Sequence, residues 1–327
     1  MTTPPPLQPD TFKDQTVGLT IFGILTVIGG VLAALFLVLT TLTALMPARG
    51  GAPQQSFQSL IPAFAMYGIA SIALTWLGIG SIMKRRWSRT LLMIGSWSGL
   101  ITGAFATVFM ALSFNSLREN IAVSMPKGDP AAVQVILIIM FATMAVIYLI
   151  IPGIWAAFYT RRHVKLTCEY YDDVPRWTDR CPPPVLAFAL WLGVCAVSFG
   201  MMAAANMAII PFFGTFLHGG IGIAASAFLM LICLYAARKA YLQDIQGWWM
   251  ALAGIILFSV SSIITYSRHE LSEIYRYMNL SPEQLAAVEK FTFSQGGYMY
   301  LTILGWVVPA LAYLFWIRKH FRPRIEA

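Results

Sequence analysis

The chain has 327 residues, of which 58% are hydrophobic and only 11% are charged, and its mean hydropathy is +0.70. Soluble domains carry about a quarter charged residues, so this composition excludes a water-soluble globular protein. The net charge of +8 does not indicate nucleic-acid binding, because the basic residues follow the pattern of a membrane protein.

The N-terminal segment, residues 1–16, contains three consecutive prolines and a single lysine. It lacks the basic region and the small-residue cleavage site of a signal peptide. We therefore expect a disordered tail, followed by an apolar segment that remains as the first membrane helix.

Eight apolar segments follow, each long enough for a membrane helix, and lipid admits no other open spanning structure. The uncharged run from Val185 to Ala237 is too long for one span, so the PFFG turn at Pro211 to Gly214 divides it. The sequence thus predicts an all-α integral membrane protein with eight transmembrane helices, at about 17–46, 59–83, 90–114, 132–160, 184–209, 215–237, 247–267 and 297–317.

Orientation follows from the lysines and arginines at the helix ends. One set of ends carries sixteen of them and the other set carries six. This asymmetry predicts that both termini lie in the cytoplasm and that the protein is in the cell (inner or plasma) membrane. Tryptophans at predicted helix ends suit an aromatic belt at the membrane surface, namely Trp87, Trp248, Trp249 and Trp316.

The segment PGIWAAFYTRRHVK, from Pro152, is echoed 157 residues later by PALAYLFWIRKHFR, from Pro309. The echo predicts a tandem duplication of a four-helix unit, and an even number of spans puts both copies in parallel orientation. The predicted organisation is a tail (1–16), repeat 1 (17–165), a cytoplasmic linker (166–183), repeat 2 (184–322, with an outer helical loop at 268–296) and a tail (323–327).

A unit whose second helix ends in KRRWSR and whose fourth ends in aromatic-x-Arg-Arg-His resembles uncharacterised bacterial multi-pass membrane proteins. The linker segment DDVPRWTDRCPPPVL, Asp172 to Leu186, also resembles these proteins. No activity accompanies this resemblance, so it implies no functional residues.

The predicted spans contain no Asp, Glu, Lys or Arg, whereas coupled transporters use such residues inside the membrane. His218, just after the PFFG turn, is expected about one turn into the sixth helix. It could hold a cofactor, but an interfacial histidine bonded to a nearby carbonyl is the preferred interpretation. No cofactor is expected.

A metal site at His163, Cys168 and Cys181 is disfavoured, because the cysteines lack the close spacing of zinc ligands. His163 and His320 are instead expected to end helices, where basic groups complement the helix dipole. No metal site is predicted.

Gly95, Gly99 and Gly103 form a doubled G-x-x-x-G face that predicts close helix packing, internal or with a partner. Two basic clusters are candidates for contact with inner-leaflet lipids. Their residues are Lys84, Arg85, Arg86, Arg89, Arg318 and Lys319.

No hydrolase, nucleotide-binding or metalloprotease motif is present, so no catalytic residue is predicted and the chain is not expected to be an enzyme. Two functions remain. One is a non-catalytic membrane subunit or scaffold that binds lipids, pigments, other membrane proteins or a second copy of itself. The other is a passive or facilitative transporter or channel for a neutral or lipophilic solute.

Overall fold

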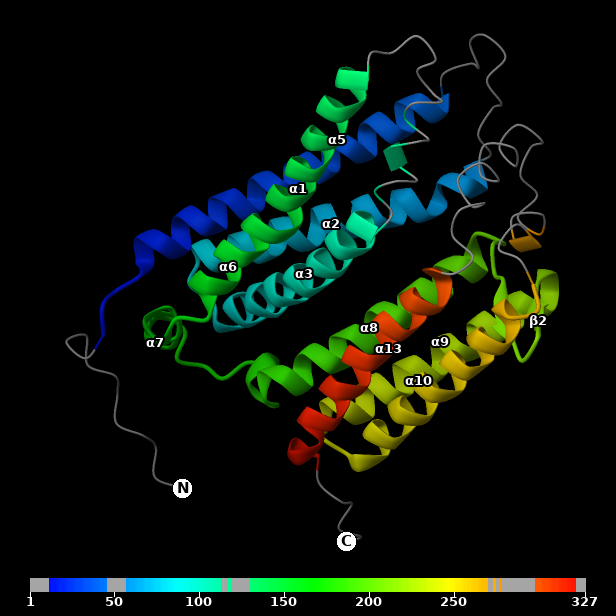
Figure 1. Ribbon diagram of the computed structural model, residues 1–327. Helices are drawn as coiled ribbons and strands as arrows, with labels where there is room; N and C mark the ends of the chain where they lie inside the picture. The colour runs from blue at the N-terminus through cyan, green and yellow to red at the C-terminus, as the bar shows by residue number, and fades with distance from the viewer. Residues whose placement is uncertain are drawn as a thin grey trace, which may run out of the picture. The chain divides into compact units, whose positions relative to one another are not determined.

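The computed structural model describes residues 12–45, 57–112, 114, 117–118, 121, 130–269, 273–274, 277 and 298–321. These residues are mostly helical (Figure 1). Within the described residues, seven helices are long and apolar enough to cross a membrane, which confirms the prediction of a helical multi-pass membrane protein. They cover Thr16–Leu42, Ala63–Ile82, Arg86–Leu112, Ala131–Tyr159, Pro183–Ala204, Gly219–Tyr241 and Ile245–Tyr266.

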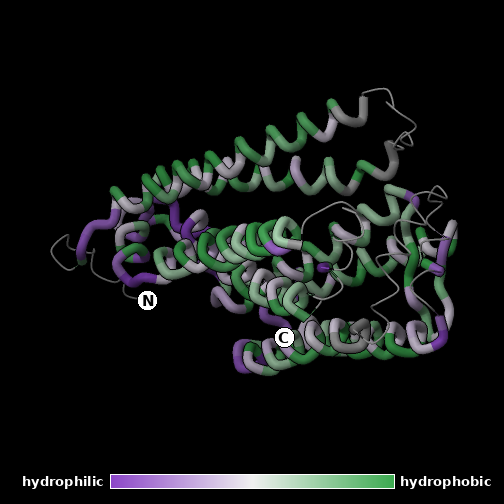
Figure 2. The backbone as a smooth tube through the Cα atoms, turned by 45° about the horizontal axis from the view of Figure 1, so that its top comes forward, coloured by the Kyte–Doolittle hydropathy of each residue, from purple (hydrophilic) through white to green (hydrophobic). Residues whose placement is uncertain are grey.

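Large apolar side chains point outward along these helices. Ile72 and Ile138 are 74% and 67% exposed, although each lies in the middle of an apolar helix. Figure 2 shows hydrophobic residues along the helices and hydrophilic ones near their ends. Such continuous apolar exposure suits a hydrocarbon environment and not water.

The chain forms two compact units. Unit 1 comprises residues 1–46, 63–107 and 140–183, and unit 2 comprises residues 47–62, 108–139 and 184–327.

In unit 1, helices α1 (Thr16–Leu45) and α2 (Phe57–Ile82) approach closely at small residues. A Cβ atom added to Gly78 would lie 2.7 Å from the carbonyl oxygen of Gly23, so neither glycine has room for a side chain. Small residues allow this contact between helix backbones in lipid. Ser81 adds a polar tie, because its hydroxyl donates to Leu19 O (3.0 Å) and lies 2.8 Å from the Tyr159 hydroxyl.

The fourth span is not one regular helix. It consists of α5 (Pro130–Ala145), a π-helical turn η2 (Val146–Ile150) and α6 (Ile151–Tyr159). Helix α3 (Arg86–Leu112) packs on this turn through Gly103, where an added Cβ would overlap the carbonyl oxygen of Tyr148. A π-helical turn interrupts the regular α-helical pattern of backbone hydrogen bonds. Here the π-helical turn lies where α3 comes into close contact with the fourth span.

Unit 2 contains α8 (Pro183–Ala204), α9 (Gly219–Tyr241), α10 (Ile245–Tyr266), α13 (Tyr298–Ile317) and the 3₁₀ turn η4 (Arg318–His320). Its core centres on Trp248, which is 1% exposed and donates its indole N–H to Leu314 O (2.8 Å). The expectation that Trp248 belongs to an aromatic belt is therefore wrong, since this ring packs against α13.

The break predicted at Pro211 to Gly214 is confirmed, because α8 and α9 are separate helices. The connection is a β-hairpin of β1 (Ile210–Phe212) and β2 (Thr215–Leu217), which the sequence analysis did not foresee. Phe213 (φ 39°) and Gly214 (φ 96°) both have positive φ, as a tight hairpin turn that matches strand twist requires.

The predicted linker is also more ordered than expected. Thr160 ends α6, Arg161 is extended, and a new helix, α7 (Arg162–Tyr171), follows, then the 3₁₀ turn η3 (Trp177–Asp179). His163 is consequently in the first turn of α7 and does not end the fourth span. The predicted outer loop lies outside the described residues except for residues 268–269, 273–274 and 277.

The residue pairs aligned by the sequence echo differ in burial. Phe158 is 6% exposed whereas Phe315 is 53% exposed, and Tyr159 is 0% exposed whereas Trp316 is 54% exposed. The two similar segments at these helix ends are thus packed differently in the two units.

Candidate functional site: a basic cavity beside α7

Helix α7 is amphipathic and lies on unit 1 through one face. Val164, Thr167 and Cys168 are at most 1% exposed, whereas Arg162 and Lys165 are exposed. Thr167 also accepts a hydrogen bond from the backbone N–H of Gln15 (3.1 Å), just before α1 begins. The helix is therefore attached to the start of α1 as well as to the core.

The C-terminal end of α7 is held by what we call the Asp172 cluster, formed by Arg85, Arg86, Asp172 and Arg176. The Asp172 carboxylate is 2% exposed and accepts hydrogen bonds from the Arg176 guanidinium (2.9 Å), the Arg85 guanidinium (3.4 Å) and the Arg86 backbone N–H (3.2 Å). The Arg86 side chain donates to the carbonyls of Asp172 and Glu169. This cluster connects the linker to the turn between α2 and α3.

Burial alone would raise the pKa of Asp172, but its hydrogen bonds with Arg176 and Arg86 and its ion pair with Arg85 outweigh burial and lower it. The pKa is lowered because all three donors favour the charged form of the carboxylate.

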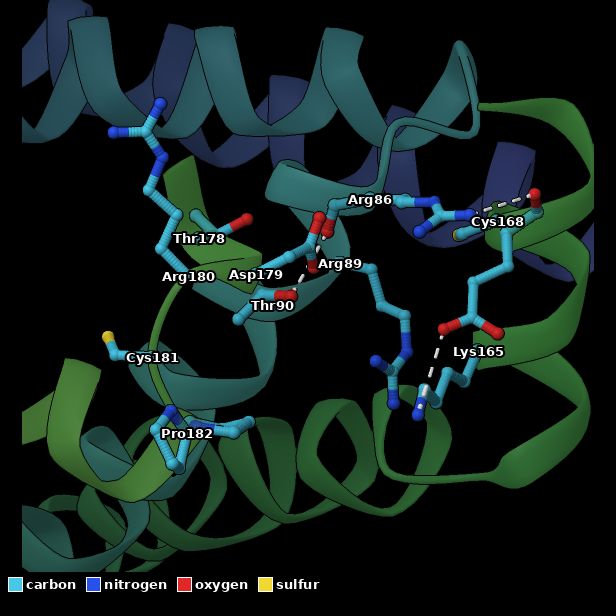
Figure 3. A pocket seen from close by; sticks show the side chains of 12 residues that line it. Arg86, Arg89, Thr90, Lys165, Cys168, Thr178, Asp179, Arg180, Cys181 and Pro182 are labelled. Carbon is cyan, nitrogen blue, oxygen red and sulfur yellow. Dashed lines mark hydrogen bonds and ion pairs between the residues drawn. The ribbon is translucent and has the colours of Figure 1, made fainter. Parts of the chain in front are cut away.

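A cavity of about 420 Å³ lies next to this cluster (Figure 3). Its lining comes from the first turn of α3, from α7 and from the linker, so all of it belongs to unit 1. Four cations and two carboxylates line it, an excess of two positive charges. The lining residues are Arg86, Arg89, Thr90, Lys165, Cys168, Glu169, Thr178, Asp179, Arg180, Cys181, Pro182 and Pro183.

Arg89 and Lys165 point toward the same part of the cavity in Figure 3, whereas the Arg180 side chain runs away from them. Lys165 forms an ion pair with Glu169 (3.6 Å), and Glu169 also acts electrostatically on Arg89. The Asp179 carboxylate accepts from the Arg176 backbone N–H (2.9 Å) and also acts electrostatically on Arg89.

Two polar atoms of this lining are buried without a partner among the described residues. They are Nε of Arg89 and the hydroxyl of Thr178, whose residue is 1% exposed. A buried donor left unsatisfied costs about 1–3 kcal/mol. Two residues of the lining therefore carry polar groups that the described residues leave without a hydrogen-bond partner.

The two thiols of the cavity are poor nucleophiles and poor metal ligands. Burial raises the pKa of Cys168 to about 12 and that of Cys181 to about 11. Thiolates, not thiols, attack substrates and bind metals. Among the described residues, no group of three or more His, Cys, Asp or Glu is placed to hold a metal ion.

Three of the basic residues predicted to contact lipid have partners within the protein, and their contact with lipid stays a prediction. Lys84 lies 3.8 Å from the centroid of the Tyr171 ring, and Arg85 and Arg86 belong to the Asp172 cluster. In unit 2, Arg318 lies over the Trp248 ring (5.0 Å) and Lys319 over the Trp316 ring (5.5 Å).

The other predicted residues lie apart from the cavity. An added Cβ at Gly99 would be 3.7 Å from Pro152, and one at Gly95 would meet no atom within 4 Å. His163 accepts a hydrogen bond from the Lys13 backbone N–H (3.3 Å). His218 precedes α9 instead of lying inside it, and its ring stacks on Tyr277 at 4.3 Å.

In unit 2, α10 holds the hairpin through a row of polar side chains. Ser261 donates to Pro211 O (2.9 Å) and accepts from the Phe213 N–H (2.9 Å), while Thr265 accepts from the Gly214 N–H (3.0 Å). His269 ends this row, with Nδ1 2.7 Å from the Glu273 carboxylate and Nε2 3.1 Å from Gly214 O.

The pH dependence of the hairpin contact is the first prediction. The Glu273 carboxylate and the Gly214 carbonyl raise the pKa of His269 above 6.5, although Arg268 opposes this. The stabilisation is therefore complete below pH 6.5 and is lost as the pH rises through the folded-state pKa. We expect the melting temperature of the wild type to fall over this window.

The matched variant is His269→Gln, measured in the same detergent by intrinsic fluorescence. Its melting temperature should not follow the wild-type decline between pH 6 and pH 9. Parallel curves for the two proteins would contradict this role of His269.

Sequence reasoning did not find the basic cavity. Two of its four basic residues, Arg86 and Arg89, were assigned to lipid headgroups, and Thr178 carries no signal of its own. One signal was available, because a basic turn (KRRWSR) and an acidic linker (EYYDD) are complementary in charge. No family model matches the chain, and no curated protein or solved structure matches it either.

Proposed function

We propose that the chain has eight transmembrane helices in two parallel four-helix repeats, with both termini in the cytoplasm. α13, at 20 residues, would be the eighth span. The turn between α2 and α3 and the turn between α9 and α10 have the same backbone conformation and hydrogen bond, which supports a duplication. Lys84 and Gln243 have φ of 57° and 58°, and the next N–H donates to a carbonyl five residues back (2.8 and 3.0 Å).

The sixteen-to-six distribution of basic residues supports the orientation. In this topology α7, the linker and the basic cavity face the cytoplasm, at the level of the inner-leaflet headgroups.

The proposed function is that of a non-catalytic membrane subunit or scaffold that binds lipids or partner proteins through its surfaces. One observation supports this proposal. At the basic cavity, the carboxylates have hydrogen-bond or ion-pair partners and the thiols are protonated, so the groups that remain without a partner are hydrogen-bond donors. Next to the cavity, the Asp172 carboxylate is held by arginines, and within the lining burial keeps the Cys168 and Cys181 thiols protonated. Donors of this kind bind a ligand but do not transfer a proton at neutral pH.

The glycine face of α3 supports a partner as well. Gly99 and Gly103 face the fourth span of the same unit, whereas the space next to Gly95 is open. A second copy of the chain or another membrane protein could bring a helix close at this position.

Native mass spectrometry after extraction in mild detergent tests the proposal. We expect the wild type to retain a phospholipid, a second protomer or a partner protein. Gly95→Leu should keep the fold and lose any protein partner held at this face. A wild-type protein that emerges as a bare monomer, or that accumulates a solute in liposomes under an imposed proton or sodium gradient, would contradict the proposal.

A further inference from the structure

We propose that the basic cavity of unit 1 binds a phosphate group, held by Arg89 and Lys165 with the hydroxyl of Thr178 as a further donor. The inference deepens the proposed binding function and rests on it for the cytoplasmic position of the cavity. The phosphate can belong to a phospholipid headgroup or to a soluble phosphate compound, since the same donors recognise both.

The charges of the lining favour an anion. Four cations and two carboxylates line the cavity. Glu169 pairs with Lys165 (3.6 Å), and both Glu169 and Asp179 act electrostatically on Arg89, but among the described residues neither carboxylate forms a hydrogen bond or ion pair with Arg89. An anion that enters the cavity therefore meets a positive environment from two helices at once.

The free donors favour phosphate over a smaller anion. Guanidinium groups bind phosphate through paired N–H donors, and an ammonium group and a hydroxyl add single donors. Arg89 Nε and the Thr178 hydroxyl are both unpartnered and buried. The three residues come from three different elements, α3, α7 and η3.

The volume also suits a headgroup. Small-molecule sites span about 300–1,000 Å³, and a cavity of about 420 Å³ can hold a phosphate together with a short polar substituent. Pro182 and Pro183 supply an apolar wall. The cavity lies at the first turn of α3, where that helix enters its apolar span, and basic pockets at this depth are suited to phospholipid headgroups.

The experiment titrates the purified full-length protein, in phosphate-free buffer and mild detergent, with inorganic phosphate and with dihexanoyl phosphatidic acid. Binding is read from the shift in melting temperature and from native mass spectrometry. We expect saturable binding of at least one probe. Binding of the lipid alone identifies a headgroup as the source of the phosphate, whereas binding of both probes identifies a site open to soluble phosphates.

Matched variants localise the binding. Arg89→Gln should weaken it about tenfold or more, and Lys165→Gln about threefold to tenfold. Arg162→Gln removes the same charge from an exposed position of α7 outside the cavity and should bind like the wild type. Thr178→Val should weaken binding without lowering the melting temperature of the unliganded protein, which separates ligand binding from a structural role.

Three results would overturn the inference. They are no saturable binding of either probe, equal losses in Arg89→Gln and Arg162→Gln, and unchanged binding in Thr178→Val and Lys165→Gln together. Equal retention of lipid by the wild type and by Arg89→Gln would show that the lipid does not bind in the cavity, but it would leave the proposed function intact. A wild type that retains neither lipid nor partner contradicts the proposed function itself.

Discussion

Replacing Gly103 by leucine is expected to separate α3 from the fourth span and to destabilise unit 1 by about 3 kcal/mol or more. Overpacking of a well-packed interior costs about 1–3 kcal/mol when side chains can shift. Here the obstacle is backbone, because an added Cβ would overlap the Tyr148 carbonyl oxygen and lie 2.7 Å from the Tyr148 Cβ. The remaining atoms of leucine have no room at all.

Gly95→Leu is the matched control on the same helix, since an added Cβ there meets no atom within 4 Å. Fluorescence-detected size-exclusion chromatography in mild detergent compares the two. We expect Gly103→Leu to aggregate or to be lost and Gly95→Leu to elute as a folded species. The reverse order would mean that α3 packs through its other end.

Replacement of Asp172 by asparagine is expected to lower the free energy of unfolding by about 2–3 kcal/mol at pH 7. The carboxylate is 2% exposed and holds Arg85 and Arg176 together. Removing its charge leaves these cations facing each other at the end of α7. This expected loss of stability is smaller than that for a fully buried ion pair, because the arginine side chains are 36% and 37% exposed.

The pH profile identifies the cause of this loss. Since its folded-state pKa is lowered below 3.8, Asp172 stabilises the protein above that pH, and the contribution disappears as the pH falls through the folded value. Thermal unfolding between pH 3 and pH 7 should show an acid-induced decline that is smaller in Asp172→Asn than in the wild type. Asp173→Asn, at an exposed neighbour, should retain the decline. Equal declines in wild type and Asp172→Asn would contradict the assigned role.

The membrane helices could be predicted well from the sequence, because length and hydropathy alone define a span. α1 was expected at about 17–46 and is Thr16–Leu45, and α10 was expected at about 247–267 and is Ile245–Tyr266. The break before α9 was also predictable, since an apolar run of that length cannot cross once.

Helix α7 was not predictable by the same argument. It is held by contacts with distant residues, such as the hydrogen bond between Gln15 and Thr167, and its sequence is too polar to be recognised as a span. The hairpin depends likewise on Ser261 and Thr265 of another helix. Hydropathy does not report which distant side chains supply these hydrogen bonds.

The candidate site was missed because basic residues at helix ends have two possible partners. From the sequence alone, lipid headgroups and the protein's own carboxylates and carbonyls are equally suitable hydrogen-bond partners for an arginine. Arg86 contacts the linker, a choice that depends on where α7 lies. The sequence analysis also did not single out Gly23 and Gly78, which form a close contact outside the G-x-x-x-G face.

The proposed sidedness of the protein is the central claim, because the cytoplasmic position of the cavity, and with it the proposed ligand, depends on a cytoplasmic α7 and linker. Cysteine labelling in intact cells with a membrane-impermeant maleimide measures it most directly. Thr178 is unsuitable for this purpose, because it is 1% exposed, whereas Val174 is 53% exposed and Ser267 is exposed. The natural Cys168 and Cys181 are buried, so their background is low. The account predicts that Ser267→Cys is labelled in intact cells and that Val174→Cys is labelled only after permeabilisation. Labelling of Val174→Cys in intact cells, with Ser267→Cys protected, would contradict it.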